Sequence, residues 1–335
     1  MRLAIGIPCY HSKDLLHISV GSLATQVNAA DLDVILSFDG DDTAQETIEY
    51  VQNTYEKYFH NVFYLINEQN QGTGGNRNNI LHFVYGDYAP EITHLAFMDH
   101  DDAILSVNTL KLCCEDIEAN VDADLFLSDI HEELYDGDIK VRYWNNNVWV
   151  HGKIFLVETL KKYNILFPLH ESEDCAFCAI TTHFCKNKVR LTYPTYYWRF
   201  NRDSQSRDID TDYFKRCGAG FTLAKLSAMQ KITESDCFRE AQKFGFFGIA
   251  AVYYNSFCNY GAENEDKDRE IQAIHDYLHF MKYKEYCKDP ELWRLQMESF
   301  LYTPANELLI GCWPTMGLEE WVEYYWNWGE ENGES

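Results

Sequence analysis

The chain has 335 residues, of which 46% are hydrophobic and 15% aromatic. A chain of this size and composition can bury a substantial core, which excludes general disorder. Its net charge of −25 disfavours non-specific binding to nucleic acid or anionic lipid.

The sequence favours a cytoplasmic protein. It has no apolar run of the roughly 18 residues that a membrane helix needs, and residues 1–8 lack the features of a signal peptide. Eleven cysteines at irregular spacing then indicate reduced, mostly buried thiols. A zinc site at Cys175 and Cys178 is an alternative, but a second Cys-x-x-Cys pair is missing.

Strands and helices alternate in the N-terminal part. Apolar runs at 2–8, 32–38 and 61–66 predict strands, and helical periodicity at 13–26 and 43–57 separates them. This order predicts an α/β fold with a doubly wound, mainly parallel sheet and right-handed crossovers.

A glycine-rich segment at 69–78 follows the third strand and precedes a helix that extends to about Tyr85. Glycines such as Gly72 let the backbone approach a ligand, and N–H groups at a helix start can bind an anion beside Arg77. The segment is neither a Walker loop nor Gly-x-Gly-x-x-Gly. A simple glycine-rich turn is the alternative.

The next apolar run, at 94–98, ends in Asp99, Asp101 and Asp102. Ligands of parallel sheets bind beyond the carboxyl ends of the strands, so these carboxylates are expected to face a substrate. An Asp-x-Asp pair can bind a hard cation together with the oxygens of a diphosphate. Alternatively, Asp102 caps a helix from about Ser106.

Further along the chain, patterns predict a helix at 106–119, a strand at 123–128 and a hairpin turn at 136–138. Residues 148–155 lead into a short helix at about 157–163, and a strand is expected at 190–193. Glu173 and Asp174 begin a helix to about residue 186, where acidic residues also suit helix capping.

A polar run at 202–212 marks the predicted boundary between domain 1–210 and a mostly helical domain 211–335. Helices are expected at 212–231, 236–259, 266–284 and 290–301, and residues 261–335 hold 17 acidic and 6 basic side chains. This domain is expected to bind the acceptor or to form a homo-oligomer. The aromatic tail around Trp321 and Trp326 favours core packing over sugar stacking.

The motifs, in this order, resemble the GT-A fold glycosyltransferases called family 2, over about the first 206 residues. The motifs are Ile7-Pro8-Cys9-Tyr10, Asp39-Gly40, Asn70-x-Gly72 with Arg77-Asn78, Asp99-His100-Asp101-Asp102, Gly152-Lys153-Ile154-Phe155, Tyr163 to Pro168, Glu173-Asp174, and Tyr197-Trp198-Arg199 with Ser204-Gln205-Ser206.

The resemblance implies a nucleotide diphosphate sugar as co-substrate, with a UDP-sugar favoured. It implies that Pro8, Tyr10 and Asp39 bind the base. Asp99 would approach the ribose or the metal, and Asp101 would hold Mn²⁺ or Mg²⁺ against the diphosphate.

The resemblance implies that Arg77 and Lys153 make cationic contacts to the diphosphate. It implies that Gly72, in the glycine-rich segment, also belongs to this binding site. His151 and His170 are candidates for a further metal ligand. In inverting members of this family one carboxylate removes the proton of the acceptor hydroxyl, and Asp174 matches that position, with Glu173 as its rival.

Two other function classes remain open. Phe38-Asp39-Gly40-Asp41-Asp42-Thr43 resembles the nucleophile motif of haloacid-dehalogenase phosphatases, with Asp39 as nucleophile and Asp41 as acid and base. A catalytically inactive sugar-binding scaffold is the other class. The acceptor of a transferase is left open between a glycan, a lipid-linked sugar, a protein and a modified nucleobase.

Overall fold

The computed structural model of the chain describes residues 1–87, 89–145, 148–202, 212–235, 249, 252–253, 256, 264–283 and 315–328. Two units make up the chain: Met1–Leu169 with Phe177–Arg202, and His170–Ala176 with Asp203–Ser335. The predicted boundary between residues 210 and 211 lies outside the described residues.

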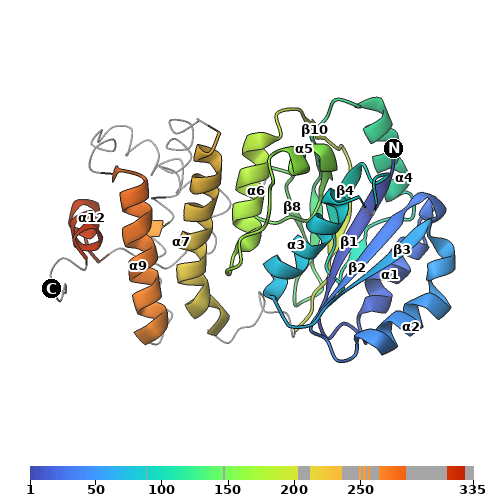
Figure 1. Cartoon of the computed structure of the whole chain (residues 1–335), viewed down its shortest axis with the longest axis horizontal. Helices are drawn as coiled ribbons and strands as arrows, with labels where there is room; N and C mark the ends of the chain where they lie inside the picture. Colours follow the sequence, from blue (N-terminus) through green and yellow to red (C-terminus); the bar gives the residue numbers. More distant parts are fainter. Residues whose placement is uncertain are drawn as a thin grey trace. The chain divides into compact units, whose positions relative to one another are not determined.

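A seven-stranded sheet forms the centre of the first unit, in the order β10-β6-β9-β4-β1-β2-β3 (Figure 1). Its strands are β1 (Leu3–Cys9), β2 (Asp33–Asp39), β3 (Asn61–Asn67), β4 (His94–Phe97), β6 (Leu125–Leu127), β9 (Lys153–Leu156) and β10 (Lys188–Arg190). All are parallel to their neighbours except β9, which pairs antiparallel with β4 and β6. The mainly parallel α/β sheet expected from the sequence is confirmed.

Helices connect the strands, as parallel pairing requires. They are α1 (Leu16–Ala24), α2 (Ala44–Thr54), α3 (Gly72–Tyr85), α4 (Thr109–Ala119), α5 (Val157–Lys162) and α6 (Glu173–Phe184), with short 3-10 turns at Ala29–Asp31 and Glu56–Tyr58. Every residue of β1 and β2 is buried, whereas β3 at the sheet edge is largely half-exposed. Because β1 pairs parallel with both β2 and β4, the carboxyl ends of these three strands meet at one edge of the sheet.

A second sheet, of four strands, lies in the same unit in the order β5-β11-β7-β8. Its strands are β5 (Ala103–Ile104), β7 (Ile130–Glu133), β8 (Ile139–Arg142) and β11 (Tyr196–Trp198). The predicted hairpin at 136–138 joins β7 to β8, with Gly137 at a φ of 86°. The strand expected at 190–193 is found slightly earlier, as β10. By pairing with β5, β11 brings Tyr196 next to the residues that follow Asp102.

The second unit contains α7 (Asp212–Thr233), α9 (Asn264–Phe280) and α12 (Leu318–Trp326), together with the first residues of α6. Helices expected at 212–231 and 266–284 match α7 and α9. The helix expected at 290–301, and most of that expected at 236–259, lie outside the described residues. None of the helices described here has the length and apolar character that crossing a bilayer requires.

The aromatic tail packs as a helix face. Trp321 is 1% exposed and its indole Nε1 donates to Ser256 Oγ at 2.8 Å. Trp326 stacks on His279 with ring centroids 3.9 Å apart. These contacts support the packing interpretation for these two side chains.

Candidate active site

The expected site lies where β1, β2 and β4 end. Parallel register places Cys9 beside Phe38, and Gly6 beside Phe97. Tyr10 and Asp39 follow Cys9 and Phe38 directly in the sequence, and Asp99 comes two residues after Phe97, so all three emerge at the same edge of the sheet. This edge is the usual ligand edge of a parallel α/β sheet.

Asp39 is a buried carboxylate that ties two loops together. Its Oδ1 accepts hydrogen bonds from Asn67 Nδ2 and from the backbone N–H of Gln71, both at 2.9 Å. The next residue, Gly40, has a φ of 64°, and a Cβ there would lie 2.5 Å from the backbone nitrogen of Asn70. The loop after β2 therefore packs backbone to backbone on the glycine-rich segment, which only glycine permits at this position.

Asp99 contacts two basic side chains. Arg77 Nη2 donates to its Oδ1 at 2.9 Å, and His151 Nε2 lies 3.2 Å from its Oδ2. Burial disfavours the charged carboxylate, but His151 and Arg77 together outweigh that effect and hold the pKa of Asp99 well below its usual range. The Asp99 side chain is still 31% exposed, so it stays charged and accessible to a ligand.

Asp102 is held by Tyr196 of β11 and by Arg199, which follows that strand. Tyr196 donates its hydroxyl proton to Asp102 Oδ2 at 2.5 Å and accepts the backbone N–H of Asp99 at 3.0 Å. The backbone N–H of Arg199 donates to Asp102 Oδ1 at 2.9 Å. Helix α4 begins only at Thr109, so Asp102 does not cap it, contrary to the alternative drawn from the sequence.

Burial and the neighbouring charge of Asp99 raise the pKa of Asp102 to about 8. Two carboxylates this close favour a state in which only one of them is ionised. The site therefore favours the ionised form of Asp99 over that of Asp102.

Asp101 is half-buried and takes part in a separate contact. Asn201 Nδ2 donates to its Oδ2 at 2.8 Å, and the Arg199 guanidinium donates to its carbonyl oxygen at 3.4 Å. Both partners follow β11. The residues after this strand thus position Asp101 as well as Asp102, which sequence patterns did not indicate.

The residues expected to contact the base and the diphosphate differ in exposure. Pro8 is buried within β1, and Tyr10 is 46% exposed beyond it. Gly72 begins α3 with a φ of 74° and open space around its Cα. Arg77 and Lys153 are both buried, and the Lys153 ammonium donates to the carbonyl oxygen of Trp149. Each of these two cations is already hydrogen-bonded to another group of the protein.

Glu173 and Asp174 form the first turn of α6, and both are half-buried. The segment just before them is fixed within the second unit. His170 Nε2 lies 3.0 Å from Ser227 Oγ of α7, and Glu171 pairs with Arg269 of α9 at 2.8 Å. The two candidate bases, Glu173 and Asp174, thus lie at the start of a helix whose later residues belong to the first unit.

Two groups of potential metal ligands occur among the described residues: Asp99, Asp102 and His151, and a second one at His11, Asp41 and Asp42. In each group the ligand atoms lie within 4.8 Å of one another. The sequence paired Asp99 with Asp101 for this role, whereas the first group contains Asp102 and His151 instead. Cys175 and Cys178 belong to neither group, so the described structure does not assemble the alternative zinc site.

The first group fits a hard or borderline divalent ion. Carboxylate oxygens and an imidazole nitrogen are ligands that Mn²⁺ and Zn²⁺ accept, and the low pKa of Asp99 keeps it deprotonated. An ion would also favour the ionised form of Asp102. The site residues that the sequence missed are Tyr196 and Asn201, and the only signal for them was their place in the aromatic and polar run from 196 to 206.

Comparison with known proteins agrees with this architecture. Poly(ribitol-phosphate) beta-glucosyltransferase of Bacillus spizizenii is 25% identical over 226 residues, which cover 62% of this chain and 34% of that protein. The chain thus spans about a third of the length of this curated relative.

Solved structures share the fold at low sequence identity. S. aureus TarS 1-349 in complex with UDP has a TM-score of 0.61 at 18% identity, covering 90% of this chain and 91% of that one. Its complex with UDP-GlcNAc gives a TM-score of 0.60, also at 18% identity, with 90% and 92% covered. The mannosyltransferase PcManGT from Pyrobaculum calidifontis, in complex with GDP-Man and Mn²⁺, gives 0.51 at 11% identity, with 90% and 87% covered.

A family model described as Glycosyl transferase family 2 matches residues 4–180. The match extends from β1 to α6 and includes Asp39, Asp99 and Asp174. Because it spans more than half of the chain, and the sheet has the expected topology, the chain belongs to glycosyl transferase family 2 and has the GT-A fold.

Proposed function

We propose that this glycosyltransferase moves a sugar from a nucleotide diphosphate donor, preferably a UDP-sugar, to an acceptor hydroxyl with inversion. The observation that carries the proposal is the charged, accessible Asp99 at the ligand edge of the sheet, held by Arg77 and His151. The UDP and UDP-GlcNAc complexes of TarS support the choice of donor.

The nucleobase is assigned to the pocket of Pro8, Tyr10 and Asp39. Asp39 Oδ1 already accepts two hydrogen bonds from protein groups, so Oδ2 is the oxygen assigned to an N–H of the base. The exposed ring of Tyr10 offers an apolar face for the base to pack against. Gly72, at the start of α3, leaves room for the diphosphate beside that helix terminus.

Metal assistance belongs to the same proposal, with Mn²⁺ or Mg²⁺ held by Asp99 and Asp101, as the sequence suggests. Asp102 and His151 are further ligands by their positions next to Asp99. A divalent ion would supply positive charge beside the leaving diphosphate. The Mn²⁺ in the PcManGT complex supports this assignment. Arg77 adds positive charge behind Asp99 and keeps that carboxylate oriented.

Asp174 is the proposed base. It would take the proton of the acceptor hydroxyl while the hydroxyl oxygen bonds to the anomeric carbon, and the bond from that carbon to the diphosphate would break on the opposite face. A single displacement of this kind inverts the configuration. Glu173, its neighbour in the first turn of α6, is the rival for this role.

Donor binding and hydrolysis provide the first test. UDP should bind more tightly with Mn²⁺ than without it, and UDP-sugar hydrolysis should need Mn²⁺. Asp101→Asn should lose both effects, whereas Asp138→Asn, in the exposed hairpin turn, should retain them. Unchanged metal-dependent binding and turnover in Asp101→Asn would remove the transferase proposal.

The base is tested separately. Asp174→Asn should retain UDP-sugar binding and lose transfer, and Glu173→Gln should retain both. Unaltered transfer by Asp174→Asn would exclude Asp174 as the base. The acceptor panel should include polyol phosphates, because the curated relative is named for poly(ribitol phosphate), along with glycans, lipid-linked sugars and modified nucleobases.

No observation favours the phosphatase alternative. The family match over residues 4–180 supports a glycosyltransferase instead. The expected result with p-nitrophenyl phosphate is no phosphate release.

A further inference from the structure

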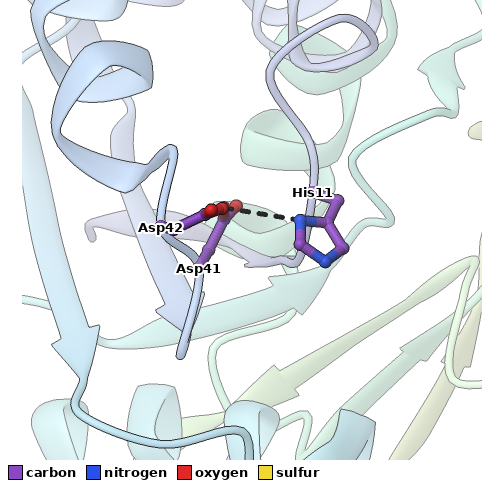
Figure 2. A group of neighbouring side chains, drawn as sticks. All are labelled: His11, Asp41 and Asp42. Carbon is purple, nitrogen blue, oxygen red and sulfur yellow. Dashed lines mark ion pairs between the residues drawn. The ribbon is translucent and has the colours of Figure 1, made fainter.

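The second group of potential ligands lies outside the machinery proposed above. It consists of His11, after β1, and Asp41 and Asp42, after β2. One nitrogen of His11 and one carboxylate oxygen from each aspartate lie within 4.8 Å of one another. Figure 2 shows both carboxylates meeting on the side that faces the imidazole ring, with Asp41 Oδ1 3.7 Å from His11 Nδ1.

The fold places these three residues next to one another. β1 and β2 pair up to Cys9 and Phe38, which brings the two following loops together. Asp41 Oδ1 accepts the backbone N–H of Thr43 at 2.9 Å and its hydroxyl at 2.7 Å, just before α2 begins. His11 has a φ of 46°, a left-handed conformation that histidine adopts uncommonly.

The second oxygen of Asp41 gives the independent indication of a ligand. The Asp41 side chain is 0% exposed, and its Oδ2 has no hydrogen-bond partner among the described residues. An ionised carboxylate oxygen that is buried without a partner is costly. The helix-start contacts explain Oδ1 and leave Oδ2 unexplained, and Asp42 beside it adds a second negative charge.

We propose that His11, Asp41 and Asp42 bind a divalent transition-metal ion, of the Mn²⁺ or Zn²⁺ class. Imidazole and carboxylate ligands together select such ions over Mg²⁺ or Ca²⁺, which prefer oxygen alone. Ligand atoms around a tetrahedral ion with bonds of about 2.0 to 2.1 Å are separated by about 3.3 Å. The 3.7 Å between His11 Nδ1 and Asp41 Oδ1 is close to this separation.

An ion at this site would join the loop after β1 to the loop after β2. The Tyr10 ring packs on the His11 ring, with centroids 4.1 Å apart. Fixing His11 would therefore also fix Tyr10, the residue assigned above to the nucleobase. The metal site itself does not depend on that assignment.

The test uses Mn²⁺ alone and the full chain, with no nucleotide present. Mn²⁺ is chosen because thiolates bind it weakly, so the cysteines contribute little. Electron paramagnetic resonance of free Mn²⁺ gives the bound fraction. All measurements are made in an Asp99→Asn background, which removes a ligand of the first group, so the remaining tight binding should belong to the second.

Asp42→Asn and His11→Ala should each weaken Mn²⁺ binding by at least about tenfold. Both side chains are exposed, so folding should be retained. Asp41→Asn should weaken Mn²⁺ binding as much. Its amide oxygen can still accept from Thr43, so the start of α2 should be retained. The matched controls, Asp14→Asn and His17→Ala, change exposed residues nearby and should bind as the parent does.

Direct ligation is read from the imidazole proton resonances. Mn²⁺ should broaden those of His11 at ion concentrations that leave those of His17 sharp. Equal Mn²⁺ affinity in the three site variants and the two controls would overturn the proposal, as would equal broadening of the two histidines. Neither result bears on whether the chain binds a UDP-sugar.

Discussion

Replacing Tyr196 with phenylalanine isolates one hydroxyl that connects two carboxylate positions of the site. That hydroxyl donates to Asp102 at 2.5 Å and accepts the backbone N–H of Asp99 at 3.0 Å. Because burial and Asp99 raise the pKa of Asp102, both bonds count as hydrogen bonds between neutral groups, each contributing about 0.5 to 1.5 kcal/mol. The Tyr196→Phe chain should therefore lose about 1 to 3 kcal/mol of stability. Its ring stack on His151, with centroids 4.6 Å apart, should persist.

Denaturant unfolding of the full chain measures the stability, and UDP titration with Mn²⁺ measures the site. Tyr196→Phe should weaken Mn²⁺-dependent UDP binding, because Asp99 and Asp102 lose their shared partner. The matched control is Tyr193→Phe, whose hydroxyl donates to Asp116 of α4 at 2.8 Å. It removes a hydrogen bond to a carboxylate, which contributes about 1.5 to 3 kcal/mol, and it should bind UDP normally. If the two variants behaved alike in both measurements, Tyr196 would not organise the acidic turn.

Three further changes test the scaffold. Burial lowers the pKa of His94 from 6.5 to about 4, so the unfolded chain takes up a proton in this pH range that the folded chain does not. As the pH drops from 6.5 to 4, the parent should lose about 3 kcal/mol of stability relative to the His94→Gln variant. Unfolding curves at each pH measure this. A stability difference between the two proteins that did not change with pH would contradict the prediction. Gly40→Ala should cost roughly 2 to 5 kcal/mol, since its Cβ would meet the Asn70 nitrogen, whereas Gly72→Ala, in open space, should cost only about 1 to 2 kcal/mol in the same assay. Trp321→Ala should cost about 3 to 5 kcal/mol, and a melting temperature equal to that of the parent would mean that α12 does not stabilise the second unit.

The sequence predicted those parts of the site that follow directly from strand ends. Asp39 and Asp99 come immediately after apolar runs, and parallel pairing brings such residues to one edge whatever their separation in sequence. The glycine-rich segment at 69–78 was likewise predictable, and Gly72 in it has a positive φ angle, which favours glycine. These features depend on short-range patterns and on one general rule of sheet topology.

The partners of the carboxylates were not predictable in this way. Tyr196 lies 97 residues from Asp99 in the sequence, and the two meet only because β11 pairs with β5. β5 is just two residues long, too short to give a periodic signal. The direction of β9 was equally hidden, because a buried apolar run is the same in parallel and antiparallel strands.

The buried cations change the expected distribution of charge in the site. Arg77 and Lys153 were expected to contact the diphosphate, but each is 3% exposed or less and bound to a protein partner. Arg77 therefore offsets Asp99, and the surface that a diphosphate would meet still carries the charge of Asp101. A diphosphate brings more negative charge to that surface, and the two buried cations are each at most 3% exposed. Under the proposed function, the compensating charge has to arrive with the donor, which is the physical reason to expect a divalent ion there.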